Sequence, residues 1–413
     1  MVGRRPLGRE FGWLWSAYAV SAYGSGLGFG ALPLVAVLVV HAGPAEVSAL
    51  SAVGPAVGAL IALPLAPWVE VRRRRPVMIA MDLTRFAAMA TVPAAYALGV
   101  LGFAQLLAVS AVVAAARIAF TAASGAYLKT LVRPEDLLVA NARFESTTWS
   151  SLAVGPPLGG AAIGLFGPVA TVLADAVSYL FSALAVSAIR DREAPRPTGG
   201  SPVRAGAVLD GWRHILGDPG LRALYLNNLL VSGLIMATEP VLAVLLVRRL
   251  GFAPWEYGLA FALPCLGGLV GSRLARRVVA RHGRRRVLRT VGTLRVVWLI
   301  GLAFVRPGVT GLVTVIAVEL AIIVHMSLYT PVLATYRLER TPGHLVARTL
   351  AAWSIGQQAS VAVLTALGGL LAGVTGPRTA LAAAGLLALA TPLLLPRREP
   401  APRADREPAR SRA

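Results

Sequence analysis

The residues of this sequence that could do chemistry are three acidic side chains inside long apolar runs: Glu239, Glu319 and Asp175. An ionisable group in hydrocarbon costs several kcal/mol unless it is paired or wetted, so each is a candidate functional group. A carboxyl in a partly desolvated cavity can take up and release a proton near neutral pH. Glu239 and Glu319 are therefore the predicted proton carriers, and a static polar pair is the alternative for each.

Other polar side chains in these runs could line a central cavity. The candidates are Tyr23, Arg117, Trp149, Asn227, Asn228, Tyr329, Gln357 and Gln358. So few polar groups predict a mostly apolar cavity, which suits a lipophilic or amphipathic molecule better than a sugar. Arg117 could bind an acidic substrate or a carboxylate partner, with a structural pair as the alternative. Asp82 and Arg85 stand one turn apart, and we expect a local ion pair near the inner membrane surface.

The composition places these residues in a membrane protein. Of the 413 residues, 56% are hydrophobic and 14% are charged, whereas a soluble domain has roughly 25% charged residues. Apolar stretches of about 20 residues, the length that crosses hydrocarbon, recur along the whole chain. They fall near 11–40, 46–68, 77–101, 104–127, 144–166, 168–189, 222–247, 255–279, 287–305, 308–335, 348–373 and 377–395. We therefore expect an all-α integral membrane protein with twelve transmembrane helices.

The net charge of +21 is concentrated on alternate connections between the apolar runs. One side has the basic segments 72–75, 129–143, 190–213, 276–286 and 337–348 together with both chain ends. The other side has only Arg248, Arg249, Arg306 and Arg378. This positive-inside pattern sets orientation, so it explains the basic composition without nucleic-acid binding. We expect cytoplasmic termini, an even number of crossings and a multi-pass location in a bacterial inner membrane.

Several kinds of site are excluded by residue type. Cys265 is the only cysteine, so the chain cannot form an internal disulfide or a thiolate metal cluster. No histidine or cysteine spacing indicates a metal site, and no cofactor is expected. Because the sequence also lacks a nucleophile–base set and a phosphate-binding loop, we do not expect an enzyme. The first apolar run has no cleavage site after a short apolar region, which predicts a transmembrane helix and not a removed signal peptide.

The chain contains an internal repeat at about half its length. Residues 74–85 match residues 284–295, and the Leu-Gly-Gly of 158–160 recurs at 367–369. Matches in the same order, about 208 to 210 residues apart, indicate duplication of a six-helix unit. Six helices in each unit also give the two halves the same orientation, as the arginine distribution requires.

A polar, Pro/Gly-rich stretch separates the two repeats. We expect an N-terminal six-helix bundle at 1–190, a cytoplasmic linker at 191–220, a C-terminal six-helix bundle at 221–396 and a disordered cytoplasmic tail at 397–413. Apolar residues at helical spacing within the linker predict a short amphipathic helix on the inner surface. They are Val208, Leu209, Trp212, Ile215 and Leu216.

The loop between the second and third runs contains the first motif that resembles a known family. Glu70 is followed by the basic pair Arg74 and Arg75, similar to the loop motif of major facilitator transporters. The sequence departs from that motif at Ala66, where glycine is usual, and at Val71, where a base is usual.

A longer run of motifs restricts the resemblance to one branch of this family. Leu-Val-Arg-Pro-Glu-Asp-Leu at 131–137 precedes Gly-Pro-Pro-Leu-Gly-Gly at 155–160 and Ala-Asp-Ala-Val-Ser-Tyr at 174–179. In this order they resemble the drug- and siderophore-exporting branch of the major facilitator superfamily, the transmembrane secretion effectors. The resemblance extends to about residue 395 and implies two pseudo-symmetric six-helix bundles around a central site.

The resemblance also implies roles for individual residues. It places Glu70 at a cytoplasmic gate close to Arg348, at the start of the eleventh helix, where a helix N-terminus attracts an acid. Asp175 stands at a position common in the family irrespective of substrate, which favours a structural role. Arg117 stands where antiporters often have an arginine, although Thr121 replaces the glycine usual four residues later.

Small residues on the fifth helix resemble the antiporter signature of exporters. They are Gly155, Pro156, Gly159 and Gly160. Such residues would let the fifth and eighth helices cross closely, and the opposing face is expected at Gly267, Gly268 and Gly271. Ordinary tight packing without bearing on the direction of transport is the alternative.

These observations together predict a secondary active transporter. We expect proton-coupled efflux of a small lipophilic or amphipathic molecule, such as a drug, a siderophore or a secondary metabolite, by alternating access. The alternatives are uptake or uncoupled transport and, more remotely, a membrane sensor on the same scaffold. The expected partners are a small-molecule substrate, protons and the lipid bilayer, and we expect a monomer.

Overall fold

The protein is built from helices throughout the part of the chain that the structure describes. The computed structural model describes residues 7–28, 30–70, 72–133, 136–190, 205–342 and 345–396. The helices of the first half are α1 (Arg9–Leu27), α2 (Ala31–Leu38), α3 (Pro44–Glu70), α4 (Arg74–Ala97), α5 (Phe103–Leu131), α6 (Leu137–Phe166) and α7 (Pro168–Ser187). These helices confirm the all-α prediction for this half.

The second half begins with α8 (Ala205–Gly217). It continues with α9 (Pro219–Val244), the π-helical turn η2 (Leu245–Arg249), α10 (Pro254–His282), α11 (Arg284–Val297), the 3₁₀ segment η3 (Trp298–Phe304), α12 (Val309–Glu339), α13 (Val346–Thr375), α14 (Pro377–Ala390) and η5 (Thr391–Leu394). Every regular element within the described ranges is thus helical.

Ten segments of the described chain are long and apolar enough to cross a membrane. The most apolar are Pro219–Arg249 and Val309–Glu339, each with a mean hydropathy of 2.2. α6 and α10 are not among the ten, although their 30 and 29 residues exceed the roughly 20 that a crossing needs. The protein therefore spans a membrane several times, while twelve crossings and cytoplasmic termini stay predictions.

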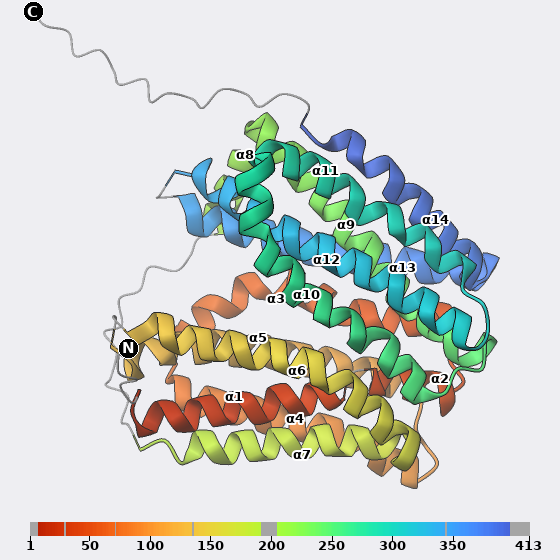
Figure 1. The fold of residues 1–413 in the computed structure, drawn as a ribbon. Coiled ribbons are helices and arrows are strands. Elements are labelled where there is room, and N and C mark those ends of the chain that lie inside the picture. The colour runs from red at the N-terminus through yellow and green to blue at the C-terminus, as the bar shows by residue number, and fades with distance from the viewer. Residues whose placement is uncertain are drawn as a thin grey trace, which may run out of the picture.

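The helices form two groups that follow the two halves of the sequence (Figure 1). In the first group, α4 packs on α5 and α7, and α1 packs on α6 and α7. In the second group, α12 packs on α10 and α11, and α13 packs on α9. The groups meet where α3 crosses α13 and where α6 crosses α10, two crossings that the repeat makes equivalent.

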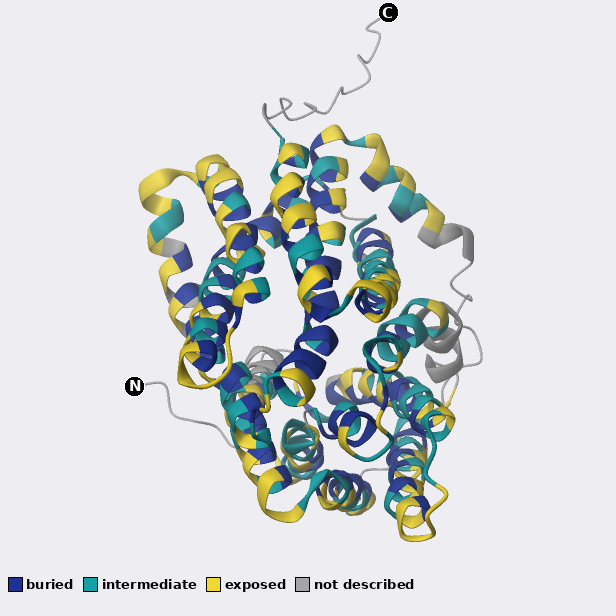
Figure 2. Ribbon diagram, turned by 90° about the vertical axis from the view of Figure 1, so that its right-hand side faces the viewer, coloured by how far each residue is buried: buried dark blue, intermediate teal, exposed yellow. Residues whose placement is uncertain are grey.

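The outward faces of the helices are rich in large apolar side chains. Leu165 is 77% exposed, Leu386 61% and Phe181 57%. Figure 2 shows exposed positions along the outer sides of the helices, while buried positions face neighbouring helices. Soluble monomers rarely expose apolar surface on this scale, whereas hydrocarbon solvates it. The exposed apolar surface therefore fits a bilayer.

The first apolar run is not the single helix that we expected over 11–40. α1 ends at Leu27 and α2 begins at Ala31. Gly30 has φ 74°, in the left-handed region that glycine adopts at little cost. A Cβ at Gly28 would lie 2.8 Å from a carboxylate oxygen of Asp175, so the close approach of α7 also requires glycine there.

The helix α8 lies in the segment where an amphipathic helix was predicted, and it packs on α13 and α9. Of the predicted apolar face, Ile215 is fully buried, while Leu209 and Leu216 are exposed. The Trp212 indole donates a hydrogen bond to the Tyr225 hydroxyl on α9 at 3.2 Å. The side chain of Val208 lies outside the described residues.

The crossing of α6 and α10 depends on glycine. A Cβ at Gly160 would lie 2.9 Å from the Pro254 carbonyl oxygen and 3.1 Å from the Cα of Gly258. The fifth and eighth apolar runs therefore do cross closely, but the opposing glycine is Gly258. Gly267 and Gly271, predicted for this role, instead pack against α12, because at 3.6 residues per turn they lie on roughly the opposite side of α10 from Gly258.

This crossing gives a matched stability test within α6. Gly160→Ala should destabilise the protein by about 1 kcal/mol or more, because backbone atoms of α10 cannot move aside for the methyl group. Gly164→Ala is the control, because a Cβ there meets nothing within 4 Å. The measurement is the thermal unfolding midpoint in detergent. Equal midpoints for the two variants would show that the crossing is not close-packed.

Candidate functional site

The two carboxyls predicted as proton carriers lie together in the second group of helices. Glu239 is on α9 and Glu319 is on α12. Their charges interact with each other, and both interact with the hydroxyl of Tyr257 on α10. Neither carboxyl has a hydrogen bond or an ion pair with any residue that the structure describes. We refer to Glu239 and Glu319 as the carboxyl pair.

Local backbone features position the carboxyl pair. Pro240 follows Glu239 directly and has no N–H, so the carbonyl of Met236 loses its usual partner within α9. The same helix ends in the π-helical turn η2, a type of distortion that is frequent at functional sites. The thiol of Cys265 on α10 also interacts electrostatically with Glu319. Side chains of α9, α10 and α12 thus interact electrostatically with one another.

Asp175 belongs to a different polar cluster, in the first group of helices. It accepts a hydrogen bond from the Tyr179 hydroxyl at 3.3 Å, and its Oδ1 has no partner among the described residues. The guanidinium of Arg85 lies 4.4 Å from the centre of the Tyr179 ring. Asp175 is therefore separated from the carboxyl pair and lies in a packed cluster.

The ion pair between Asp82 and Arg85 completes this cluster. The predicted pair does form, and both of its side chains are buried in the helix group. The Ser182 hydroxyl donates to the second Asp82 oxygen at 2.7 Å. Burial of the pair follows from the packing of α4 on α7, which brings a hydroxyl to satisfy the remaining acceptor.

Arg295 is the repeat equivalent of Arg85, and it forms a similar cluster in the second group. Its guanidinium lies 3.7 Å from the centre of the Tyr329 ring and donates to Asn227 Oδ1 at 2.5 Å. Asn227 Nδ2 donates in turn to the carbonyl of Thr391 at 2.8 Å. Asn227 and Tyr329 are both fully buried. The structure thus places these two cavity candidates in a closed cluster.

The other cavity candidates lie in more open positions. Tyr23 on α1 is exposed and shares a 2.7 Å hydrogen bond with the Ser150 hydroxyl on α6. Asn228 Nδ2 donates to Gln357 Oε1 at 3.3 Å, linking α9 to α13. Arg117 is exposed near the middle of α5. The side chain of Trp149 lies outside the described residues.

The residues predicted for the cytoplasmic gate are only partly described. Arg348 Nη1 forms an ion pair at 3.1 Å with Asp210 of α8. Arg75 donates to the carbonyl of Val186 at 3.3 Å, at the C-terminal end of α7, where a cation is favourable. Arg74 begins α4, and the side chain of Glu70 lies outside the described residues. A contact between Glu70 and Arg348 therefore stays a prediction.

The two groups touch along α3 and α13, and several of their contacts lie at one end of the molecule, which we call the contact end. Arg248 Nη1 donates to the carbonyl of Ala42 at 2.8 Å, and Gly369 lies against Ser48. The crossing of Gly160 and Gly258 lies at the same end. Connectivity places this end opposite the C-terminus of α7 and the N-terminus of α9, because α6, α10 and their neighbours run antiparallel.

The Arg295 cluster allows a test that compares how much the neighbouring residues Asn227 and Asn228 contribute to stability. Asn227→Ala should destabilise the protein by about 3 kcal/mol, because it leaves a buried guanidinium without its polar partner. Asn228→Ala removes a single hydrogen bond and should cost about 1 kcal/mol. Thermal unfolding in detergent measures both. A larger loss for Asn228→Ala would contradict the structural role of Asn227.

Comparison with known proteins agrees with this architecture. The sequence model of the Major Facilitator Superfamily matches residues 14–326 and 235–412. The multidrug efflux pump Tap of Mycolicibacterium fortuitum is 31% identical over 264 residues, which cover 62% of this chain and 61% of that protein. The chain thus matches less than two thirds of the length of this relative.

Solved structures share the fold at low sequence identity. A bacterial homologue of the iron transporter ferroportin, in its inward-facing state, has a TM-score of 0.75 at 18% identity, covering 94% of this chain and 99% of its own. The nucleoside transporter NupG has a TM-score of 0.76 at 8% identity, covering 94% of this chain and 98% of its own. The resemblance found in the motifs is therefore confirmed, and this chain belongs to the Major Facilitator Superfamily.

Proposed function

We propose that this transporter exports a small lipophilic or amphipathic molecule in exchange for protons. The observation that carries the proposal is the carboxyl pair, two acids from different helices that have no cationic partner among the described residues. Two interacting carboxylates in a low-dielectric site repel each other when both are ionised, so the ionisation of one disfavours the ionisation of the other. An intramembrane acid without a structural partner is a natural site for proton coupling.

Alternating access provides the route for the substrate. The two helix groups contact each other through α3 and α13 and through α6 and α10. The fold is shared with a transporter solved in an inward-facing state. Rocking of the two groups about a site near the middle of the membrane, with the contact end opening as the opposite end closes, would expose this central site to each side of the membrane in turn. Proton uptake by the carboxyl pair would then change the balance between the two orientations.

Efflux as the direction, and a drug-like molecule as the cargo, are supported by the similarity to a multidrug efflux pump. The sparse polar groups near the centre favour a lipophilic or amphipathic substrate. We further propose two six-helix bundles, at 1–190 and 221–396, with both termini in the cytoplasm of a bacterial cell. The arginine-rich connections and the two helix groups support this topology.

Neutralising the carboxyl pair should abolish coupled transport. With Glu239→Gln or Glu319→Gln, uptake of a lipophilic cationic dye into inverted vesicles under a proton gradient should fall to the level of vesicles without the protein. Glu339→Gln is the matched control, because Glu339 is 53% exposed at the end of the same helix as Glu319. Dye fluorescence measures transport, and immunoblotting measures abundance.

Three results would contradict this proposal. Transport at the wild-type rate by both carboxyl variants would show that the carboxyl pair is not the proton site. Transport that ignores a collapsed proton gradient would show an uncoupled carrier, and accumulation only in right-side-out vesicles would show uptake.

The gate predicted at Glu70 has its own test. Glu70→Gln should reduce transport without lowering abundance, because closure of the cytoplasmic side would lose the attraction between an acid and the N-terminus of α13. The reduction should appear as a lower maximal rate in the same vesicles. An unchanged rate would exclude this role for Glu70.

A further inference from the structure

A groove of about 1120 Å³ opens on the protein surface where α10 turns into α11, away from the carboxyl pair. Residues between 282 and 294 line it, and five of them are basic: His282, Arg284, Arg285, Arg286 and Arg289. Arg284 forms an ion pair with Glu339. Arg286 and Arg289 are exposed and have no ion pair with any described residue. The groove therefore has an excess of positive charge.

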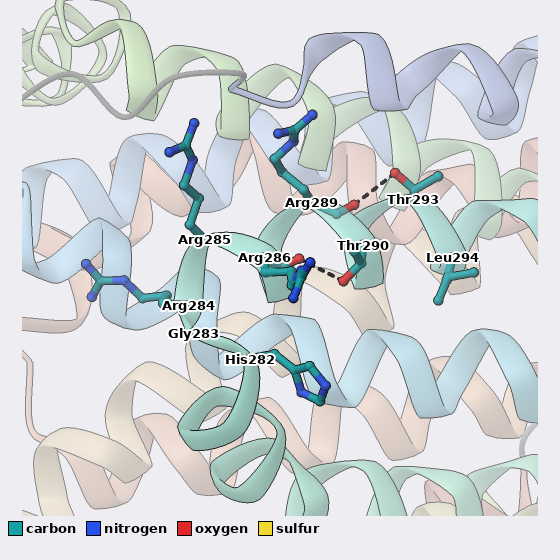
Figure 3. A pocket seen from close by; sticks show the side chains of 9 residues that line it. All are labelled: His282, Gly283, Arg284, Arg285, Arg286, Arg289, Thr290, Thr293 and Leu294. Atoms are coloured by element: carbon teal, nitrogen blue, oxygen red, sulfur yellow. Dashed lines mark hydrogen bonds between the residues drawn. The ribbon is translucent and has the colours of Figure 1, made fainter.

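The side chains spread over one exposed face of α11. Figure 3 shows Arg286 and Thr290 facing the viewer above His282, while Arg285 and Arg289 extend together in another direction. Helical spacing accounts for this arrangement, because positions three and four apart lie on the same side of a helix. An anion in the groove would therefore meet guanidinium groups from more than one turn.

The first half of the repeat shows that the fold does not require this chemistry. Arg286, Arg289, Thr290 and Thr293 stand where the first half has Pro76, Ile79, Ala80 and Leu83. The arginine pair that precedes them is present in both halves, at 74–75 and 284–285. Orientation in the membrane is already supported by that pair. These polar groups are therefore a property of the second half alone, and the repeat does not explain them.

The exposed face of α11 becomes apolar beyond the threonines. Leu294 is 43% exposed, Val297 40% and Trp298 42%. Since an α-helix rises about 5.4 Å per turn, a cationic end, a hydroxyl-bearing middle and an apolar stripe follow one another within a few turns. A molecule that matches this order has an anionic head, a polar junction and a hydrocarbon tail.

We propose that this groove binds an anionic phospholipid of the surrounding bilayer. Its phosphate would contact Arg286, on the face of α11 that continues to Thr290 and Leu294, since guanidinium groups bind phosphate oxygens through paired hydrogen bonds. Arg289, exposed in the same groove, would add to the positive charge that attracts the head group. Its acyl chains would lie along Leu294 and Trp298. Basic pockets between transmembrane helices on the cytoplasmic side favour lipids with negatively charged head groups. A free phosphate ion would use the arginines but would gain nothing from the apolar stripe.

The test measures lipid binding and does not depend on transport. The purified full chain in detergent is titrated with phosphatidylglycerol, and native mass spectrometry counts the bound lipid. R286Q/R289Q should bind phosphatidylglycerol about 30-fold more weakly, because each arginine beside an anionic lipid contributes about a fivefold factor. R286K/R289K should retain much of the affinity. The matched control R277Q/R281Q removes the same charge from exposed arginines of α10 outside the groove and should bind like the wild type.

Each other outcome overturns the proposal. An equal loss in R277Q/R281Q would mean that binding follows diffuse surface charge. Phosphatidylcholine that binds as tightly as phosphatidylglycerol would exclude a site for anionic head groups. Glycerol 3-phosphate that binds as tightly as the lipid, with no effect of Leu294→Ser on either, would identify a site for a soluble anion.

Discussion

The cost of placing a charge in hydrocarbon governs where this protein keeps its ionisable residues. Arg85 is held by Asp82 and two aromatic rings, and Arg295 by Asn227 and Tyr329. Those partners make the arginines part of the scaffold. The carboxyl pair lacks such partners among the described residues, and this is why we propose it as the site of proton coupling. The buried charges that have partners thus belong to the scaffold, whereas those without partners are the candidates for function.

The two halves share a scaffold but differ in their chemistry. Arg85 and Arg295 occupy equivalent positions, and each guanidinium stacks on an aromatic ring of the next helix along the repeat. Asp82, however, is replaced by Gly292 in the second half, so Arg295 relies on neutral partners. The carboxyl pair likewise belongs to the second half alone. Duplication has therefore produced equivalent folds with unequal electrostatics, and the protonatable centre lies on one side of the molecule.

Much of the fold could be predicted from the sequence, because a helix that crosses the hydrocarbon needs about 20 apolar residues. The all-α architecture and the Asp82–Arg85 pair follow from local patterns and are confirmed. The break between α1 and α2 was missed, since its cause is the approach of Asp175 from a distant helix. The burial of Asn227 and Tyr329 was missed for a similar reason, because it depends on Arg295 reaching them across helices. Local sequence contains no record of such tertiary contacts.

The contact end joins the two halves largely through backbone. Gly160 faces Gly258, Gly369 faces Ser48, and Arg248 binds a main-chain carbonyl. Such contacts depend little on the side chains that neighbouring positions present, provided that the glycines are kept. Residues lining the route of the substrate can therefore be exchanged during evolution without altering how the halves meet. The range of molecules handled can change across lineages while the junction between the halves is inherited unchanged.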